Sequence, residues 1–212
     1  MSTLTEDRVL TEHQINWWGE QKCRACNPDG TPKNVFDGTT KCHDCQSTGW
    51  TQWAALAHEP YTKIIDGIYV GGCDYADENG REAEYHVGRG DPFDAVVSMY
   101  GHAHKYGPYG PDGMTHHMYP FADSALDEDA IGLAYRAAKT VDTEVRAGSS
   151  VLVRCQAGLN RSNLVAGIYL IAYRKMDPKA VVDLLRTRSP WVLCNDDFEA
   201  FLLNDVAPGA VL

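Results

Sequence analysis

The stretch VLVRCQAGLNRSNLVAGIYLIAYR, residues 151–174, decides the fold class. It begins with a short run, Val151 to Arg154, that is mainly apolar and contains two β-branched valines, and this run predicts a buried strand. The apolar run from Leu164 to Arg174 predicts a helix that follows directly after a loop containing Cys155. A strand that passes through a short loop into a helix is typical of α/β proteins.

The sequence around this stretch continues the same alternation. Residues 64–70 predict two strands joined by an Asp66-Gly67 turn, and Ala95–Met99 predict a further buried strand. Apolar residues at spacings of three and four predict an amphipathic helix ending at Gly148, and residues 179–188 predict another helix. We therefore expect an α/β domain with a central, mainly parallel sheet flanked by helices.

Composition divides the chain near residue 60. Residues 1–59 hold four of the seven cysteines and four of the five tryptophans, with little aliphatic periodicity. Pro60 tends to close an element and restricts the residue before it. We therefore predict a small N-terminal segment, 1–59, followed by the α/β catalytic domain, 60–212.

The loop at residues 155–162 has the properties of a phosphate cradle. Backbone N–H groups between a strand and a helix N-terminus attract anions, and they stabilise a cysteine thiolate at the base of the loop. Arg161 can hold two phosphate oxygens at once, Gly158 permits a tight backbone turn, and Ser162 can hydrogen-bond the sulfur. The predicted phosphate-binding residues are Gln156, Ala157, Gly158, Leu159, Asn160 and Arg161.

The motif Cys155-x5-Arg161-Ser162, between a strand and a helix, resembles the signature of dual specificity and protein tyrosine phosphatases. The resemblance extends from about Ile64 to Leu203. It implies hydrolysis of phosphomonoesters through a phosphocysteine, with Cys155, Arg161 and Ser162 as catalytic residues and no cofactor for catalysis. Phosphotyrosine proteins, together with phosphoserine and phosphothreonine proteins, are the implied substrates.

The resemblance also implies an aspartic acid that protonates the leaving oxygen. The segment HMYPFADS, residues 117–124, fits the family's acid loop, and Asp123 lies 32 residues before Cys155. A positioned general acid is typically worth about 10²–10⁴ in rate. Asp127, Glu128 and Asp129 are rivals, but they suit the acidic first turn of the following helix, so we predict Asp123.

Two positions depart from the family pattern. Arg154 stands where the family usually has a histidine that helps fix the loop and the ionisation of the cysteine. Asn160 stands where many dual specificity enzymes have serine, and asparagine can make similar hydrogen bonds. Cys73 and Cys194 have no catalytic companions in the sequence and are predicted to be structural. His102, His104, His116 and His117 are predicted to share one loop, without metal-binding spacing.

Four cysteines near the N-terminus have the spacing of a metal site. Cys23-x2-Cys26 and Cys42-x2-Cys45 predict a closed tetrahedral site for structural Zn²⁺, in a ribbon at about residues 20–50. The second pair resembles zinc ribbons and the cysteine-rich module of DnaJ-type chaperones. Iron in a rubredoxin-like site is the main alternative, and a redox dithiol is the weaker one. Zinc would stabilise a segment too short to fold readily alone.

Charge and hydropathy exclude several functions. The formal net charge of −10 argues against nucleic acid as a partner, since such proteins need a basic face. The longest strongly apolar stretch is about half of the roughly 20 residues needed to span a bilayer, so no membrane partner is expected. The N-terminus lacks a secretory pattern, and we expect a cytoplasmic protein. An RNA 5′-triphosphatase and a catalytically silent phosphate-binding scaffold that uses the zinc module remain as alternative functions.

Overall fold

The computed structural model describes residues 21–22, 50–51, 59–76, 82–88, 90–100, 114–187 and 192–209. In the N-terminal segment, β1 (Gln21–Lys22) pairs with β2 (Trp50–Thr51) in antiparallel fashion. All four predicted zinc ligands lie outside the described residues. No helix in the described ranges is both long enough and apolar enough to cross a membrane.

The central sheet has five strands in the order β3-β4-β9-β7-β8. Their bounds are Tyr61–Ile65 for β3, Ile68–Gly72 for β4, Ala95–Ser98 for β7, Thr115–Met118 for β8 and Val151–Cys155 for β9. The hairpin β3–β4 turns at Asp66-Gly67, and the other three pairings are parallel. This topology confirms the predicted α/β class and the mainly parallel sheet.

The middle strands are buried because both of their faces are covered. Every residue of β7 and β9 is buried, as expected for parallel strands in an α/β protein. Val151, Val153 and Cys155 belong to the main hydrophobic core with the helices. Leu152 belongs to a smaller cluster with Phe93 and Val96, against which Tyr61, Tyr69 and Tyr85 pack.

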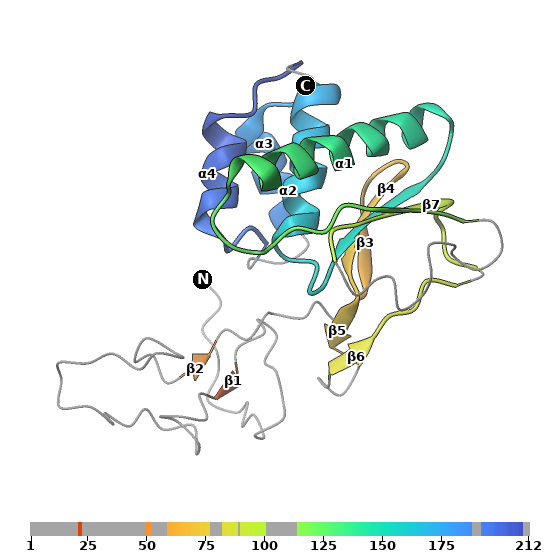
Figure 1. The fold of residues 1–212 in the computed structure, drawn as a ribbon. Coiled ribbons are helices and arrows are strands. Elements are labelled where there is room, and N and C mark those ends of the chain that lie inside the picture. Colours follow the sequence, from red (N-terminus) through yellow and green to blue (C-terminus); the bar gives the residue numbers. More distant parts are fainter. Residues whose placement is uncertain are drawn as a thin grey trace, which may run out of the picture.

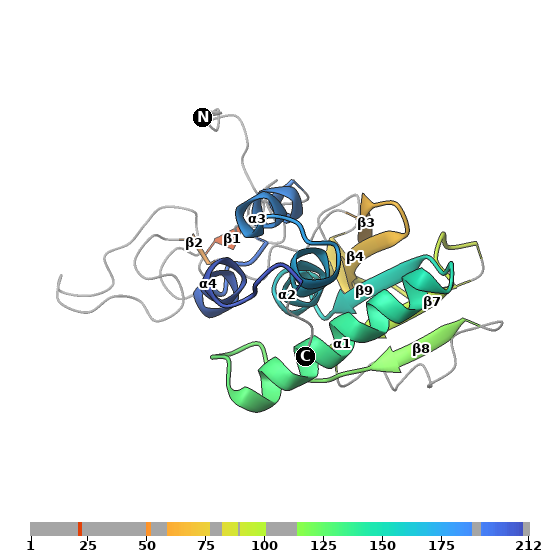
Figure 2. The ribbon, with the colours of Figure 1, turned by 90° about the horizontal axis from the view of Figure 1, so that it is seen from above.

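In the described residues, helix α1 lies between β8 and β9, and the other helices follow β9. α1 spans Glu128–Arg146, α2 spans Arg161–Ile168 and continues into the π-helix η3 (Tyr169–Tyr173), α3 spans Pro178–Arg186 and α4 spans Asp196–Asn204. Figure 1 shows the helices together on one side of the sheet, and Figure 2 shows α2 beside α1, α3 and α4. α2 is buried from Ser162 onward, because it contacts both the sheet and these three helices.

Helix boundaries have local causes. The Asp127 side chain caps α1 by accepting a hydrogen bond from the Ala130 N–H at 2.8 Å. The helix ends before Gly148, which has the positive φ of +94° typical of a C-terminal glycine. Asp177 and Asn195 cap α3 and α4 in the same way as Asp127 caps α1. The predicted helix end at Gly148 is therefore confirmed.

Several elements differ from the sequence predictions. The prediction that His116 and His117 lie in a loop is wrong, because both belong to edge strand β8. The helix predicted from Leu164 begins three residues earlier, at Arg161, and its last turns are a π-helix. The small hairpin of β5 (Asp74–Ala76) and β6 (Glu82–Glu84) had no counterpart among the predicted elements.

Parallel pairing brings three strand ends to one edge of the sheet. Gly72, at the end of β4, is opposite Cys155 at the end of β9, and Ser98 of β7 is opposite Arg154. In open α/β sheets, ligands bind outside the carboxyl ends of the strands. The loop that follows Cys155 lies at this edge.

Candidate active site

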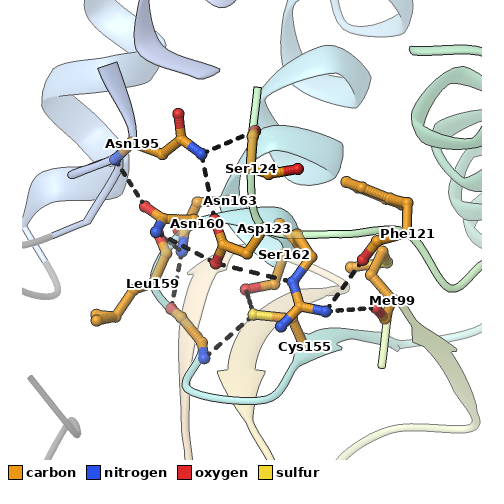
Figure 3. A network of polar contacts seen from close by, with 12 residues as sticks. Met99, Phe121, Asp123, Ser124, Cys155, Leu159, Asn160, Ser162, Asn163 and Asn195 are labelled. Carbon is orange, nitrogen blue, oxygen red and sulfur yellow. Dashed lines mark hydrogen bonds and ion pairs between the residues drawn. The ribbon is translucent and has the colours of Figure 1, made fainter. Parts of the chain in front are cut away.

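Cys155 ends β9 and places its sulfur at the base of the phosphate loop. Its side chain is buried, with 1% of its surface exposed. The Gly158 N–H donates a hydrogen bond to the Cys155 Sγ at 3.2 Å, and the Ser162 Oγ lies 3.4 Å from the same sulfur. Figure 3 shows both contacts. An N–H donor, a hydroxyl group and the N-terminus of α2 surround this sulfur.

The shape of the loop is fixed from two sides. The buried Asn163 amide donates hydrogen bonds to the Gly158 and Leu159 carbonyl oxygens at 2.8 and 2.9 Å. On the other side, Gly158 has φ +70°, and a Cβ built there would lie 2.6 Å from the backbone carbon of Gly71. Only a residue without a side chain fits this approach between the loop and β4.

Arg161 connects the loop to two neighbouring segments. Its NH1 donates to the carbonyl oxygens of Met99, just after β7, and Phe121, each at 3.1 Å. The side chain is 12% exposed, and its Nε has no hydrogen-bond partner within the described residues. Arg161 is therefore held by its carbonyl contacts, and its Nε faces the Asp123 carboxylate without a hydrogen bond.

Asp123 lies over this loop, in the segment between β8 and α1. Its Oδ2 is 3.8 Å from the Arg161 Nε and accepts a hydrogen bond from the Asn160 Nδ2 at 3.3 Å. Of the rival acids, Asp127 is the N-cap of α1, and Glu128 and Asp129 lie in its first turn. The structure thus brings Asp123 together with Arg161 and Asn160, and it gives the three rivals helix-terminal positions.

Two residues at the site escaped the sequence analysis. The Asn195 Nδ2 donates to the Asp123 Oδ1 at 3.3 Å and to the Ser124 carbonyl oxygen at 3.2 Å. Cys194, predicted to be structural, is exposed and donates to the Asn160 Oδ1 at 3.4 Å. Both residues lie within the stretch that resembles the phosphatase family, Ile64 to Leu203, but no motif marked either of them as part of the site.

Arg154 lies in β9, directly before Cys155, and supports the loop from the end of the strand. It is 2% exposed, and its Nε donates to the Ser98 Oγ at 2.9 Å. The Ser98 Oγ in turn lies 2.9 Å from the His116 Nε2. A chain of polar contacts therefore crosses β9, β7 and β8 at the position where the family's histidine was expected.

Burial changes the ionisation of two groups beside the loop. It raises the pKa of the Cys73 thiol to about 11, and the nearby Arg154 guanidinium only partly opposes this rise. The Cys73 N–H donates to the Gln156 carbonyl oxygen, so the two segments are in contact. Burial also raises the pKa of Asp74, although a hydrogen bond from the Gln156 side chain acts to lower it. Cys73 is therefore a neutral, inert thiol at physiological pH.

A metal site is not apparent in the part of the chain that the structure describes. There, no three or more His, Cys, Asp or Glu side chains are grouped so as to hold an ion. The predicted zinc ligands Cys23, Cys26, Cys42 and Cys45 are outside this part, so the zinc prediction stays a prediction.

Part of the chain is similar to known phosphatases. Residues 103–205 match the family model described as dual specificity phosphatase, catalytic domain; the match covers 103 of the 212 residues. A curated relative, MAP kinase phosphatase with leucine-rich repeats protein 3 of Dictyostelium discoideum, is 36% identical over 59 residues. That alignment spans 28% of this chain and only 7% of the relative's length.

Solved phosphatase structures share the fold. Human DUSP28 aligns with a TM-score of 0.50 at 17% identity, covering 68% of this chain and 90% of the other. The Cydia pomonella PTP-2 phosphatase aligns with a TM-score of 0.51 at 20% identity, and the alignment covers 68% of this chain and 88% of the other. A putative mouse dual specificity phosphatase, complexed with zinc tungstate, aligns with a TM-score of 0.51 at 18% identity, and the alignment covers 68% of this chain and 84% of the other.

Residues 103–205 are thus similar to the catalytic domain of cysteine-based phosphatases, and solved phosphatase structures share the fold. Within this class, the matched catalytic domain is of the dual specificity type.

Proposed function

We propose that this protein hydrolyses phosphomonoesters of proteins through a phosphocysteine at Cys155. One observation carries the proposal: a buried sulfur at a strand end lies 3.2 Å from a loop N–H and 3.4 Å from a hydroxyl group. Arg161, which is 12% exposed and whose Nε–H makes no hydrogen bond within the described residues, completes the cradle. This set of groups suits a thiolate and a phosphate dianion better than it suits any neutral ligand.

The first chemical step transfers the phosphoryl group to the enzyme. The Cys155 thiolate attacks phosphorus, an S–P bond forms, and the bond from phosphorus to the ester oxygen breaks. Asp123 gives its proton to that oxygen, so the product leaves as a neutral alcohol or phenol. The Arg161 Nε and the inward N–H groups of the loop stabilise charge on the equatorial phosphate oxygens.

The second step restores the enzyme. Water attacks the phosphocysteine, the S–P bond breaks, and Asp123 accepts a proton from the water, so that inorganic phosphate forms. The Ser162 hydroxyl, 3.4 Å from the sulfur, can donate a hydrogen bond to the departing thiolate. The family carries out this chemistry without a cofactor.

Replacement of Cys155 by serine tests the mechanism. C155S should abolish turnover of 4-nitrophenyl phosphate, while vanadate still binds, because the loop N–H groups and Arg161 are unchanged. C73S is the matched control, since Cys73 is a second buried thiol beside the loop with a raised pKa. Unchanged hydrolysis by C155S, or an equal loss in C73S, would exclude Cys155 as the nucleophile.

The proposed substrates are phosphotyrosine proteins and, more slowly, phosphothreonine and phosphoserine proteins. Strict tyrosine phosphatases deepen the site with an additional recognition loop, and only eleven residues, 60–70, precede Gly71-Gly72 in this domain. The similarity to a MAP kinase phosphatase supports protein substrates. A panel of phosphotyrosine, phosphothreonine and phosphoserine peptides with triphosphorylated RNA provides the test. Faster turnover of RNA, with affinity that falls steeply in salt, would favour the RNA 5′-triphosphatase instead.

We also propose that Cys23, Cys26, Cys42 and Cys45 bind one structural zinc ion in a separate N-terminal module of a cytoplasmic protein. The support is their sequence spacing, which suits tetrahedral sulfur coordination. Elemental analysis should find about one zinc per chain, and replacement of Cys23 and Cys42 should remove it. Iron, or no metal in protein prepared with zinc under reducing conditions, would contradict this assignment.

A further inference from the structure

Asp123 is held by side-chain amides that the chemistry above does not use. Its Oδ2 accepts a hydrogen bond from Asn160, and its Oδ1 accepts one from Asn195, each at 3.3 Å. Figure 3 shows the carboxylate between the two amides. Asn160 belongs to the phosphate loop and Asn195 precedes α4, so both oxygens of the acid are oriented by parts of the chain distant in sequence.

The orientation of each amide is fixed by a backbone N–H group. The Asn160 Oδ1 accepts from the Asn195 N–H at 3.1 Å, and the Asn195 Oδ1 accepts from the Asp197 N–H at 3.1 Å. A backbone N–H can only donate, so the amide oxygen must face it. The NH₂ group of each asparagine must then point toward Asp123.

The backbone of the acid segment is anchored by the same two elements. The Asn195 Nδ2 also donates to the Ser124 carbonyl oxygen, and Arg161 donates to the Phe121 carbonyl oxygen. One turn beyond Asn195, the Phe198 ring of α4 packs against Phe121, with 6.4 Å between ring centroids. The segment 121–124 is therefore connected both to the phosphate loop and to the start of α4.

We propose that Asn195, together with Asn160, is a positioning residue that holds the Asp123 carboxyl over the phosphate loop for proton transfer. This inference rests on the proposed function of Asp123 as the general acid. At 3.3 Å both hydrogen bonds are longer than the usual 2.7–3.2 Å, so the carboxyl can leave them for the leaving oxygen at small cost.

The test compares substrates that differ in their need for an acid. Phenyl phosphate has a poor leaving group, whereas the leaving group of 4-nitrophenyl phosphate departs readily without a proton. N195S removes the donor but leaves a hydroxyl that can still cap α4. N195D keeps both the size and the cap and replaces the donor with an acceptor. N204S, at the exposed far end of the same helix, is the matched control.

We expect N195S and N195D to lower kcat on phenyl phosphate by about tenfold to a hundredfold, and kcat on 4-nitrophenyl phosphate by less than about threefold. Vanadate affinity should stay unchanged in both variants. In a D123N background the same substitutions should have almost no further effect, because residues that act through one group are not additive. N204S should behave like the wild-type protein.

Two results would overturn the inference alone: an equal loss on both substrates, or a loss that persists in the D123N background. Either would assign Asn195 a purely structural role. If D123N itself shows no dependence on the leaving group, the acid assignment under the proposed function fails as well. The two failures are therefore distinguishable.

Discussion

Replacing Gly158 with alanine would probe the approach between the phosphate loop and β4. A Cβ at this position would lie 2.6 Å from the Gly71 backbone carbon, 2.7 Å from the Gly72 nitrogen and 2.8 Å from the Gly71 oxygen. All three atoms belong to the backbone of a strand that is paired on both sides. No flexible side chain can move away to make room, so the loop itself has to move.

The size of the movement follows from the contact distances. Ordinary contact begins at 3.4 Å, and the difference from 2.6 Å is 0.8 Å. Such a shift would take the Gly158 N–H away from the Cys155 sulfur, which it contacts at 3.2 Å. Misplacing a reacting group by about 1 Å can cost about 10²-fold in rate, and losing one oriented donor costs about 10²–10³-fold. We expect kcat/KM to fall by at least about 10²-fold.

Gly148 provides a matched control for backbone strain. It also has a positive φ, +94°, but a Cβ there would meet nothing within 4 Å. Both G148A and G158A should lose about 1–2 kcal/mol of stability from the left-handed conformation. Only G158A should lose a further amount of about 1–3 kcal/mol through overpacking.

The assay combines urea unfolding with kinetics on 4-nitrophenyl phosphate and calorimetric titration with vanadate. G148A should keep full activity and G158A should lose both rate and vanadate affinity. If G158A is destabilised no more than G148A and keeps wild-type affinity and rate, the reasoning from the close approach is wrong.

Three other substitutions test other parts of the site. R161K should lower kcat/KM on 4-nitrophenyl phosphate by about 10²–10³-fold, because one ammonium group cannot donate hydrogen bonds to the Met99 and Phe121 carbonyls and to a phosphate at the same time. Near-normal activity of R161K would contradict this reasoning. S98A should lower the free energy of unfolding in urea by about 1–3 kcal/mol, since the buried Arg154 Nε loses its acceptor, and an unchanged value would refute this role. The neutral Cys73 thiol contributes at most about 2–3 kcal/mol to the free energy of unfolding below pH 9. This contribution should disappear as the pH rises to 11, because the thiol loses its proton at lower pH in the unfolded chain than in the folded one. In urea unfolding, C73A should show a weaker decline of stability over this pH range, and a pH profile identical to that of the wild-type protein would contradict the reasoning.

The sequence was most informative where the relevant residues are contiguous. Cys155, Gly158, Arg161 and Ser162 lie within eight positions, so their residue types report directly on one loop. The strands β7 and β9 were also predictable, because parallel strands buried on both faces form short continuous apolar runs. In both cases, local chemistry determines the local structure.

Contacts across long sequence separations were not predictable. Asn195 contacts Asp123 across 72 positions and Asn160 across 35, and a partly buried asparagine carries no sequence pattern that reveals such a partner. The acceptors that hold Arg161 are backbone carbonyls, which every residue type possesses. β8 escaped prediction because its polar Thr115-His116-His117 sequence suits a strand at the sheet edge as well as a loop.

The carbonyl contacts of Arg161 also affect the thermodynamics of ligand binding. A free arginine loses about 0.5–1.5 kcal/mol of conformational entropy when a ligand immobilises it. Here two hydrogen bonds already restrict the side chain, so a phosphate group that binds to the Nε orders little that was mobile. The saving corresponds to roughly 2- to 12-fold in Kd, obtained without any additional contact to the ligand. Calorimetry on the wild-type protein should therefore show a smaller entropic penalty for phosphate than a site whose arginine is free in solution.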